Sequence, residues 1–280
     1  MVLESLMSPI KAEHKPLRMF WIGVLYATVA IFLSVWIFKA YSSLVMVFLT
    51  TTAAVPLMYR TMKQQEKRDM EIPKEKNLLK EHSRVIEFLM FLFLGFLVAY
   101  SFWYIVLPSS LVQTMFQSQI QTIESINARI ISGSVAQSTI LAQIFLNNVK
   151  VLMFSIFFAF FYGAGAIFIL TWNASVISAA VGTFIKNRIA EIATNATVFN
   201  YFHMFSLGLV RYMIHGIPEI GAYFVGGLAG GIISAAMINH DLETEKFRNI
   251  MLDVLDLILI AIALLVIGSL LEVFITPLFF

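Results

Sequence analysis

The sequence predicts an all-α protein, a polytopic bundle of about seven transmembrane helices with one further re-entrant or broken helix. Three observations predict this fold class: 59% of the 280 residues are hydrophobic, only 13% are charged, and the mean hydropathy is +0.84. A chain this apolar belongs to the integral membrane class. Each crossing needs about 20 residues, so six to eight crossings fill the chain and leave no room for a catalytic domain outside the membrane.

The first two apolar runs, 19–38 and 41–59, are separated only by Lys39 and Ala40. Such a short connection predicts a tight hairpin of antiparallel helices. The next segment, 60–87, carries eight Lys or Arg against six acidic residues. Because cytoplasmic loops of membrane proteins are enriched in Lys and Arg, this segment and the N-terminus are both predicted to be cytoplasmic.

A third span, 88–106, is expected to lead outward and to end before Pro108. The outer segment that follows, 109–149, has apolar residues at spacings of three and four, which predicts an amphipathic helix. This helix either rests on the outer leaflet or on neighbouring spans, or is a docking surface for an extracytoplasmic partner. The apolar residues are Val112, Phe116, Ile120, Ile123, Ile126 and Ile130.

A fourth span of about 150–172 is expected to return inward and to end in a turn at Trp172-Asn173. The charged segment 240–253 is interpreted as cytoplasmic, so an even number of crossings must separate it from that turn. Three apolar runs precede it, and one of them is therefore predicted to be re-entrant. The runs are 175–190, 199–214 and 220–238. We assign the re-entrant role to the second, because it is short and is followed by Gly216 and Pro218. The last run, 254–276, then places the C-terminus outside.

The stretch His215-Gly-Ile-Pro-Glu219 places ionisable side chains beside two helix breakers. A bilayer core solvates neither charge nor unpaired backbone, so the stretch is expected inside protein or beside water. Arg211 lies four residues before His215 and shares its helical face, and Glu219 is expected to turn back toward either. We interpret these residues as a polar membrane site. It is either a buried Arg–Glu clamp or a site for a proton, an ion or a lipid headgroup.

No catalytic signature is present, and the sequence predicts no catalytic residue, metal ligand or cofactor. A zinc protease needs His-Glu-x-x-His on one helix, whereas Pro218 stands between His215 and Glu219. The absence of Cys excludes disulfides, and a net charge of +2 gives no basis for binding nucleic acid. Small residues spaced by four predict close helix packing and a homo-oligomer, and Gly163 is interpreted in the same way. The spaced pair is Gly227 and Gly231.

Three motifs together resemble the stage II sporulation protein M family over about residues 140–278. They are His215-Gly-Ile-Pro-Glu219, Gly226-Gly-Leu-Ala-Gly-Gly231 and Leu271-Glu272-Val-Phe-Ile-Thr-Pro277, and the Asn147-Asn148 pair, Gly163 and Trp172-Asn173 add to them. The resemblance places functional weight on Asn148, Asn173, His215, Gly216, Glu219 and Glu272. Ala174 departs from the glycine expected after Asn173, and the length suggests an archaeal-type member.

In spore-forming bacteria, members of that family are polytopic membrane proteins that act with peptidoglycan-degrading partners, and others occur in organisms that never sporulate, so the resemblance implies an assembly or scaffold role in cell-envelope remodelling. Two rival functions stay open: a transporter or channel with a polar site at a broken helix, and an intramembrane enzyme acting on lipid or peptide. We divide the chain into an N-terminal part, 1–135, and a family-like membrane core, 136–280. The expected partners are membrane lipids, a second copy of the chain and an envelope-remodelling protein.

Overall fold

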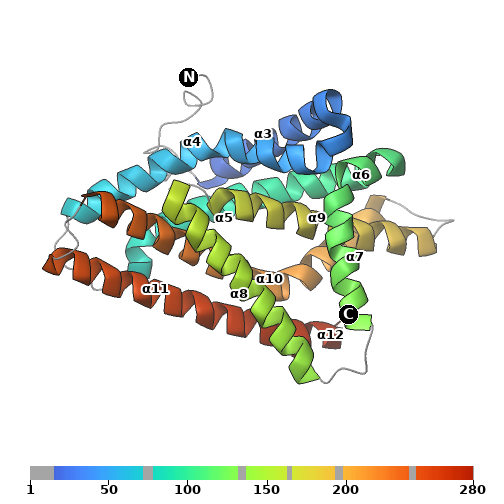
Figure 1. Cartoon of the computed structure of the whole chain (residues 1–280). Helices are drawn as coiled ribbons and strands as arrows, with labels where there is room; N and C mark the ends of the chain where they lie inside the picture. Colours follow the sequence, from blue (N-terminus) through green and yellow to red (C-terminus); the bar gives the residue numbers. More distant parts are fainter. Residues whose placement is uncertain are drawn as a thin grey trace.

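The computed structural model describes residues 16–71, 78–131, 137–162, 166–192, 198–239 and 244–279, and within these ranges the chain is a bundle of helices (Figure 1). This confirms the all-α fold class. The long helices are α3 (Pro16–Phe38), α4 (Ser42–Glu71), α5 (Leu78–Val106), α8 (Gln137–Tyr162), α9 (Ala166–Ile192), α10 (Val198–Asn239) and α11 (Glu245–Leu270). The short elements are η1 (Lys39–Tyr41), α6 (Ser109–Met115), α7 (Gln117–Ile131), η2 (Leu271–Ile275) and α12 (Thr276–Phe279).

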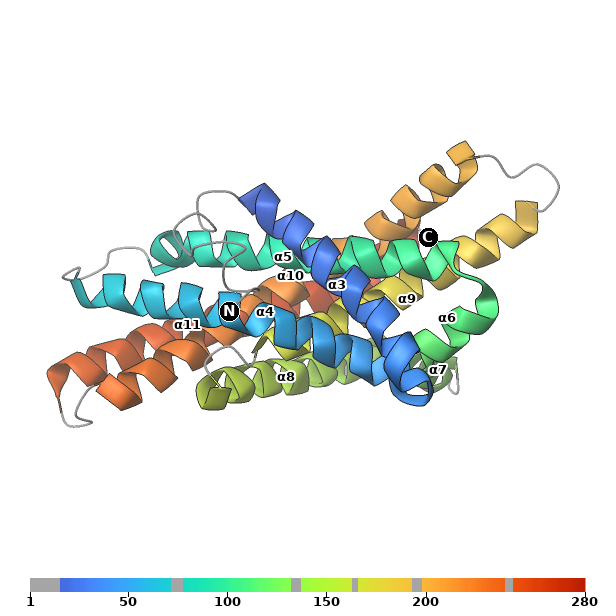
Figure 2. The same cartoon turned by 90° about the horizontal axis from the view of Figure 1, so that it is seen from above.

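Six stretches of the described chain are long and apolar enough to cross a membrane. The first, Leu17–Met58, comprises α3 and α4 joined by the 3-10 turn η1, which confirms the predicted hairpin. Figure 2 shows the long helices running back and forth along one common direction, with α3 crossing the others obliquely. The protein is therefore a multi-pass membrane protein, with seven long helices in its described part, as the sequence predicted.

The outer segment forms two helices rather than one, because the chain bends at Phe116 between α6 and α7. Pro108 precedes the first of them. Phe116 is fully buried, and α7 packs on α9 and α4. The amide of Gln119 donates to the Ser43 carbonyl oxygen and to Ser175 Oγ, both at 3.1 Å. These contacts agree with the interpretation that the amphipathic segment rests on neighbouring spans.

Two predicted boundaries are wrong. The turn at Trp172-Asn173 does not exist, because both residues lie inside α9; α8 instead ends at Tyr162 and α9 begins at Ala166. The break at 215–219 does not exist either, because α10 is helical from Val198 to Asn239 with Pro218 inside it. In Figure 1 the axis of α10 changes direction along its course, as expected for a helix with an internal proline. No re-entrant segment interrupts the described part of this region.

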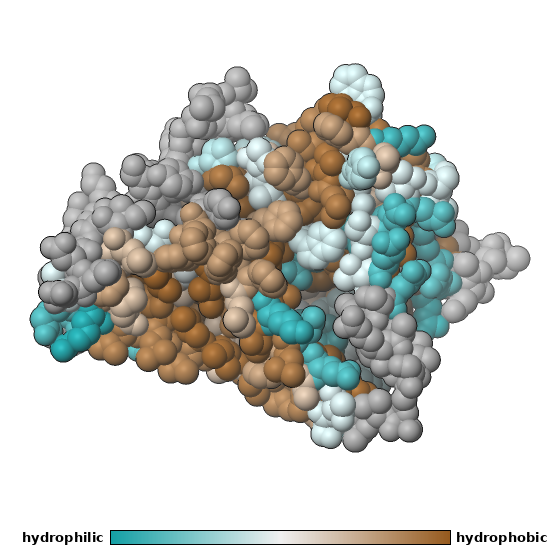
Figure 3. All heavy atoms as spheres, in the orientation of Figure 1, coloured by the Kyte–Doolittle hydropathy of each residue, from teal (hydrophilic) through white to brown (hydrophobic). Residues whose placement is uncertain are grey.

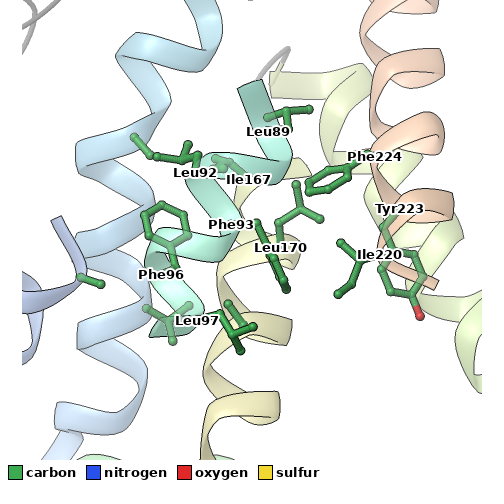
Figure 4. Packing of buried hydrophobic residues seen from close by; sticks show 14 of the residues in the cluster. Leu89, Leu92, Phe93, Phe96, Leu97, Ile167, Leu170, Ile220, Tyr223 and Phe224 are labelled. Atoms are coloured by element: carbon green, nitrogen blue, oxygen red, sulfur yellow. The ribbon is translucent and has the colours of Figure 1, made fainter. Parts of the chain in front are cut away.

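The core lies where α5, α9 and α10 meet (Figure 4). Side chains of α5 such as Phe93 meet Leu170 of α9 and Phe224 of α10, and the Phe93 and Phe224 rings pack edge to face with centroids 6.1 Å apart. Many large apolar side chains also face outward, notably on α3, α8 and α11. Figure 3 shows apolar residues over most of one face and polar residues gathered around α7. An apolar exterior is what a helix bundle presents to lipid.

Candidate functional site

Polar side chains from three helical elements meet where α8, α10 and the end of α11 pack together. Asn148 comes from α8, Glu219 from α10 and Glu272 from η2, and each of these elements contacts the other two. The amide nitrogen of Asn148 donates to Glu219 Oε1 at 2.6 Å. A hydrogen bond to a carboxylate is among the stronger ones, so this contact joins α8 to α10 firmly. With His215 and Thr276 these residues form what we call the polar centre.

Gly268 allows α11 to approach Glu219 closely. A Cβ atom at this position would lie 2.7 Å from Glu219 Cγ and 3.3 Å from the carbonyl oxygen of His215. The first distance is shorter than real Cβ contacts and the second is tight, so a side chain at this position would force the Glu219 side chain to shift. The sequence interpretation did not include Gly268, although a glycine one turn before Glu272 is the kind of signal that could have drawn attention to it.

The end of α11 widens into η2, a single π-helical turn that carries Glu272. Such turns inside α-helices occur frequently at functional sites. The Thr276 hydroxyl donates to the Leu271 carbonyl oxygen at 3.1 Å and lies 3.3 Å from Nδ1 of His215. A hydroxyl has one proton to donate, so the hydrogen bond with His215 requires Nδ1 to carry a proton and donate it to Thr276. His215 is thereby held between α10 and the end of α11.

The two carboxyl groups of the polar centre lie within electrostatic range of each other. Glu219 and Glu272 are close enough for their charges to repel, and the hydroxyl of Tyr223 lies within electrostatic range of both. In Figure 4 this hydroxyl points away from the apolar side chains around Ile220. A protein interior at membrane depth screens such repulsion poorly, so the arrangement needs a compensating positive charge or proton.

The other two predicted polar residues lie elsewhere. Arg211 is two turns before Glu219, and its guanidinium carbon lies 5.5 Å from the Phe184 ring centroid; it also acts electrostatically on His215. Asn173 donates to the carbonyl oxygen of Ile169 in its own helix at 2.8 Å. The structure therefore brings together Asn148, His215, Glu219 and Glu272, while Asn173 lies outside their cluster.

Residues 85–277 match the protein family described as Stage II sporulation protein M. The chain belongs to this family. The match runs from α5 to α12, so it covers more than half of the chain and every residue of the polar centre. No curated protein and no solved structure matches the chain.

The glycines of this family member differ in how closely they are approached. A Cβ on Gly227 would lie 2.7 Å from Cβ of Ala166, whereas a Cβ on Gly216 would meet only Ile220 Cδ1 at 3.9 Å. Close helix contact therefore depends on Gly227 and not on Gly216. Gly231 is buried in α10, and Gly163 lies between α8 and α9, outside the described residues. Sequence reasoning missed Gly230, whose Cβ would lie 2.4 Å from the carbonyl oxygen of Ile156.

Proposed function

We propose that this chain is an assembly component of the cell membrane that holds envelope-remodelling proteins in place. The observation that carries the proposal is the architecture. In the described residues the chain is almost entirely membrane helix, and α6 and α7 are the only helices that neither cross nor extend a crossing helix. A protein built in this way acts through the surfaces that it presents to other molecules. Membership of the stage II sporulation protein M family supports the same role.

The face that we assign to the partner is the polar side of α7. Gln117 and Gln121 are exposed one turn apart on this helix, while Ile120 between them and Phe116 just before them are turned toward the bundle. The excess of Lys and Arg in 60–87 supports a cytoplasmic position for that segment and therefore an external position for α7. The C-terminus is then also outside, since seven crossings separate it from the cytoplasmic N-terminus.

In this role the polar centre holds three helical elements of the scaffold together. The Asn148 to Glu219 hydrogen bond joins α8 to α10, and the His215 to Thr276 contact joins α10 to the end of α11. Interhelical polar contacts contribute about 0.6–2 kcal/mol each in membrane proteins. Two such contacts at one junction fix the relative positions of three helices, which is what a scaffold requires of its core.

The experiment is site-specific photo-crosslinking in native membranes. A photoreactive residue at Gln121 should crosslink to a protein that cuts or builds the cell envelope, and depletion of the chain should disturb the shape of the envelope. The matched control is Ile120 on the same helix, which packs against the core and should crosslink only within the chain. If Gln121 reacts only with lipid or with the chain itself, and the purified protein moves an ion across vesicles, the assembly role is refuted in favour of transport.

A further inference from the structure

A small second core lies apart from the main one, in the C-terminal half of α9. Val181, Ile185 and Ile189 of α9 form it, and partly buried side chains of α5 and α10 pack against it. In Figure 2 the end of α9 and the start of α10 extend past the neighbouring helices on one side of the bundle. These two helix ends therefore have a packing arrangement of their own, to which the polar centre does not contribute.

Two arginines of this region lie against one aromatic ring. The guanidinium carbon of Arg188 in α9 lies 5.6 Å from the Phe184 ring centroid, and that of Arg211 in α10 lies 5.5 Å from it. Gly208 lets the ring lie close to α10, because a Cβ at Gly208 would be only 3.1 Å from Cδ1 of Phe184. The two guanidiniums are therefore neighbours on one small surface, and we call them the arginine pair.

The arginine pair lies at the level where the apolar part of a neighbouring helix ends. The candidate span of α5 is Ile86–Val106, and Lys186 Nζ donates to the carbonyl oxygen of Leu107, the next residue, at 3.4 Å. Arg188 follows Lys186 by two residues, a rise of about 3 Å along α9. Lipid headgroups occupy this depth, and long basic side chains reach it from the ends of apolar helices.

The chemistry of the arginine pair selects a phosphate group. A guanidinium has five N–H donors, more than a single contact within the chain uses, and its planar fork matches the oxygens of a phosphate. The Arg188 side chain is exposed and that of Arg211 is half-buried, so a ligand can reach both from outside the bundle. Two adjacent guanidiniums offer the positive charge and the donors that one phosphate needs.

Apolar side chains beside the arginine pair favour a lipid as the source of that phosphate. Phe202, Val210 and Ile217 of α10 are exposed, and their spacings of eight and seven place them on one face of the helix. Val210 directly precedes Arg211, and Ile217 lies nearly two turns closer to the buried middle of α10. A soluble anion would gain nothing from this face, whereas the acyl chains of a lipid would cover it.

We propose that the arginine pair binds the phosphate of one anionic phospholipid, whose acyl chains lie along the exposed face of α10. Such a lipid ties the end of α9 to the start of α10, where the two helices extend past the bundle. The site needs only the depth of the arginine pair, so it does not depend on which end of the bundle is cytoplasmic. It is also independent of the assembly role, which concerns the partner at α7.

The test is native mass spectrometry of the detergent-purified full chain, titrated with phosphatidylglycerol or with phosphatidylcholine. We expect the first phosphatidylglycerol to bind at least about tenfold more tightly than the first phosphatidylcholine. Arg188→Gln should weaken phosphatidylglycerol binding about tenfold, the factor that corresponds to the loss of one charge-assisted contact, and adding Arg211→Gln should remove the preference. Lys39→Gln is the matched control, because it removes one exposed positive charge from η1, which packs on α3, α4 and α6.

Four results overturn the proposal. Equal binding of the two lipids by the parent protein would mean that the arginine pair selects no anion. A preference that survives in Arg188→Gln and in the double variant would place the lipid elsewhere. An equal loss in Lys39→Gln would mean that overall charge attracts the lipid. Displacement of phosphatidylglycerol by inorganic phosphate at a similar concentration would mean that the site takes a soluble anion.

The single variant keeps the test decisive if the double variant does not fold. Arg188 is exposed at the end of α9, so Arg188→Gln is expected to fold, and unchanged phosphatidylglycerol binding in this variant alone refutes the site. Crosslinking at Gln121 is unaffected by any of these results, so the two proposals fail separately.

Discussion

Replacement of Gly95 by alanine tests a very close contact between two helix backbones. Gly95 of α5 faces Gly23 of α3, and a Cβ at Gly95 would lie 2.2 Å from the carbonyl oxygen of Phe20 and 3.0 Å from Cα of Gly23. These are backbone atoms, so no side chain can rotate away to make room. Ordinary contact begins at 3.4 Å, and α3 must therefore move by about 1 Å relative to α5.

The expected cost follows from that displacement. Forcing one extra methyl into a packed interior costs about 1–3 kcal/mol. Alanine also favours helix over glycine by up to about 1 kcal/mol, which offsets part of the cost. A net loss of about 1–2 kcal/mol lowers the unfolding temperature by about 2–8 °C in a protein of this size. Gly95→Ala should therefore unfold several degrees below the parent protein.

The assay is scanning fluorimetry of detergent-purified protein, with Gly216→Ala as the matched control. Gly216 is also buried in a long helix, but its added Cβ would meet only Ile220 Cδ1 at 3.9 Å, which is ordinary contact. The control gains the same helix propensity without the clash, so it should unfold at the same temperature as the parent or slightly higher. If Gly95→Ala matches the control, α3 and α5 do not touch at these glycines and the reasoning is refuted.

Three further predictions use the same preparations or intact cells. Asn148→Leu should lower the free energy of unfolding by about 1–3 kcal/mol, because it leaves the Glu219 carboxyl without its hydrogen-bond partner. The double variant with Glu219→Gln should lose less stability than the sum of the two single variants. Additive losses would mean that the hydrogen bond is absent. Gly227→Leu should lower the unfolding temperature because its side chain meets Ala166 at 2.7 Å, and an unchanged temperature would contradict that packing. The chain has no native Cys, so cysteines at Gln65 and Gln121 can be labelled without background, and an impermeant thiol reagent should reach only Gln121. If only the cysteine at position 65 were labelled, the topology would be the inverse of the one expected.

The sequence was sufficient to predict the first half of the bundle. The runs 19–38 and 41–59 became α3 and α4, and the span that ends before Pro108 became α5. Hydropathy located these membrane helices but not all of their ends, because α4 continues through charged residues to Glu71 and α5 begins at Leu78, ten residues before the predicted span. The amphipathic spacing around Phe116 also identified residues that do pack inward.

The boundary between α8 and α9 could not be found in the same way. The apolar sequence continues through this region, and the polar Asn173 looked like a turn. In the structure its amide donates to the carbonyl oxygen of Ile169 four residues earlier, so it fits inside α9 without a break. A polar residue that bonds to its own helix costs little in a membrane interior. Residue type alone therefore does not mark a helix end here.

The hydrogen-bond partner of Glu219 could not be identified from the sequence either. Neighbouring positions suggested Arg211 or His215, because residues four or eight apart lie on one face of a helix. The structure gives Glu219 a hydrogen bond from Asn148, which is 71 residues away in the chain. Such a contact arises from the packing of α8 on α10, and no local pattern encodes it. The family-like motifs did mark Asn148 and Glu272, but they did not say that these residues meet.

Two prolines of the family-like motifs lie close in sequence to the polar centre, although neither breaks its helix. Pro218 has no N–H, so the carbonyl of Ile214 loses its intrahelical donor one turn before Glu219. Pro277 has the same effect on the opposite helix, one turn after Glu272. Backbone oxygens freed inside a bilayer must be served by side chains, water or ions, and polar residues therefore gather around them. The helix breakers predicted an interruption of the chain, but α10 stays helical from Val198 to Asn239 with Pro218 inside it, and the two prolines instead lie close in sequence to the two carboxyl groups of the polar centre.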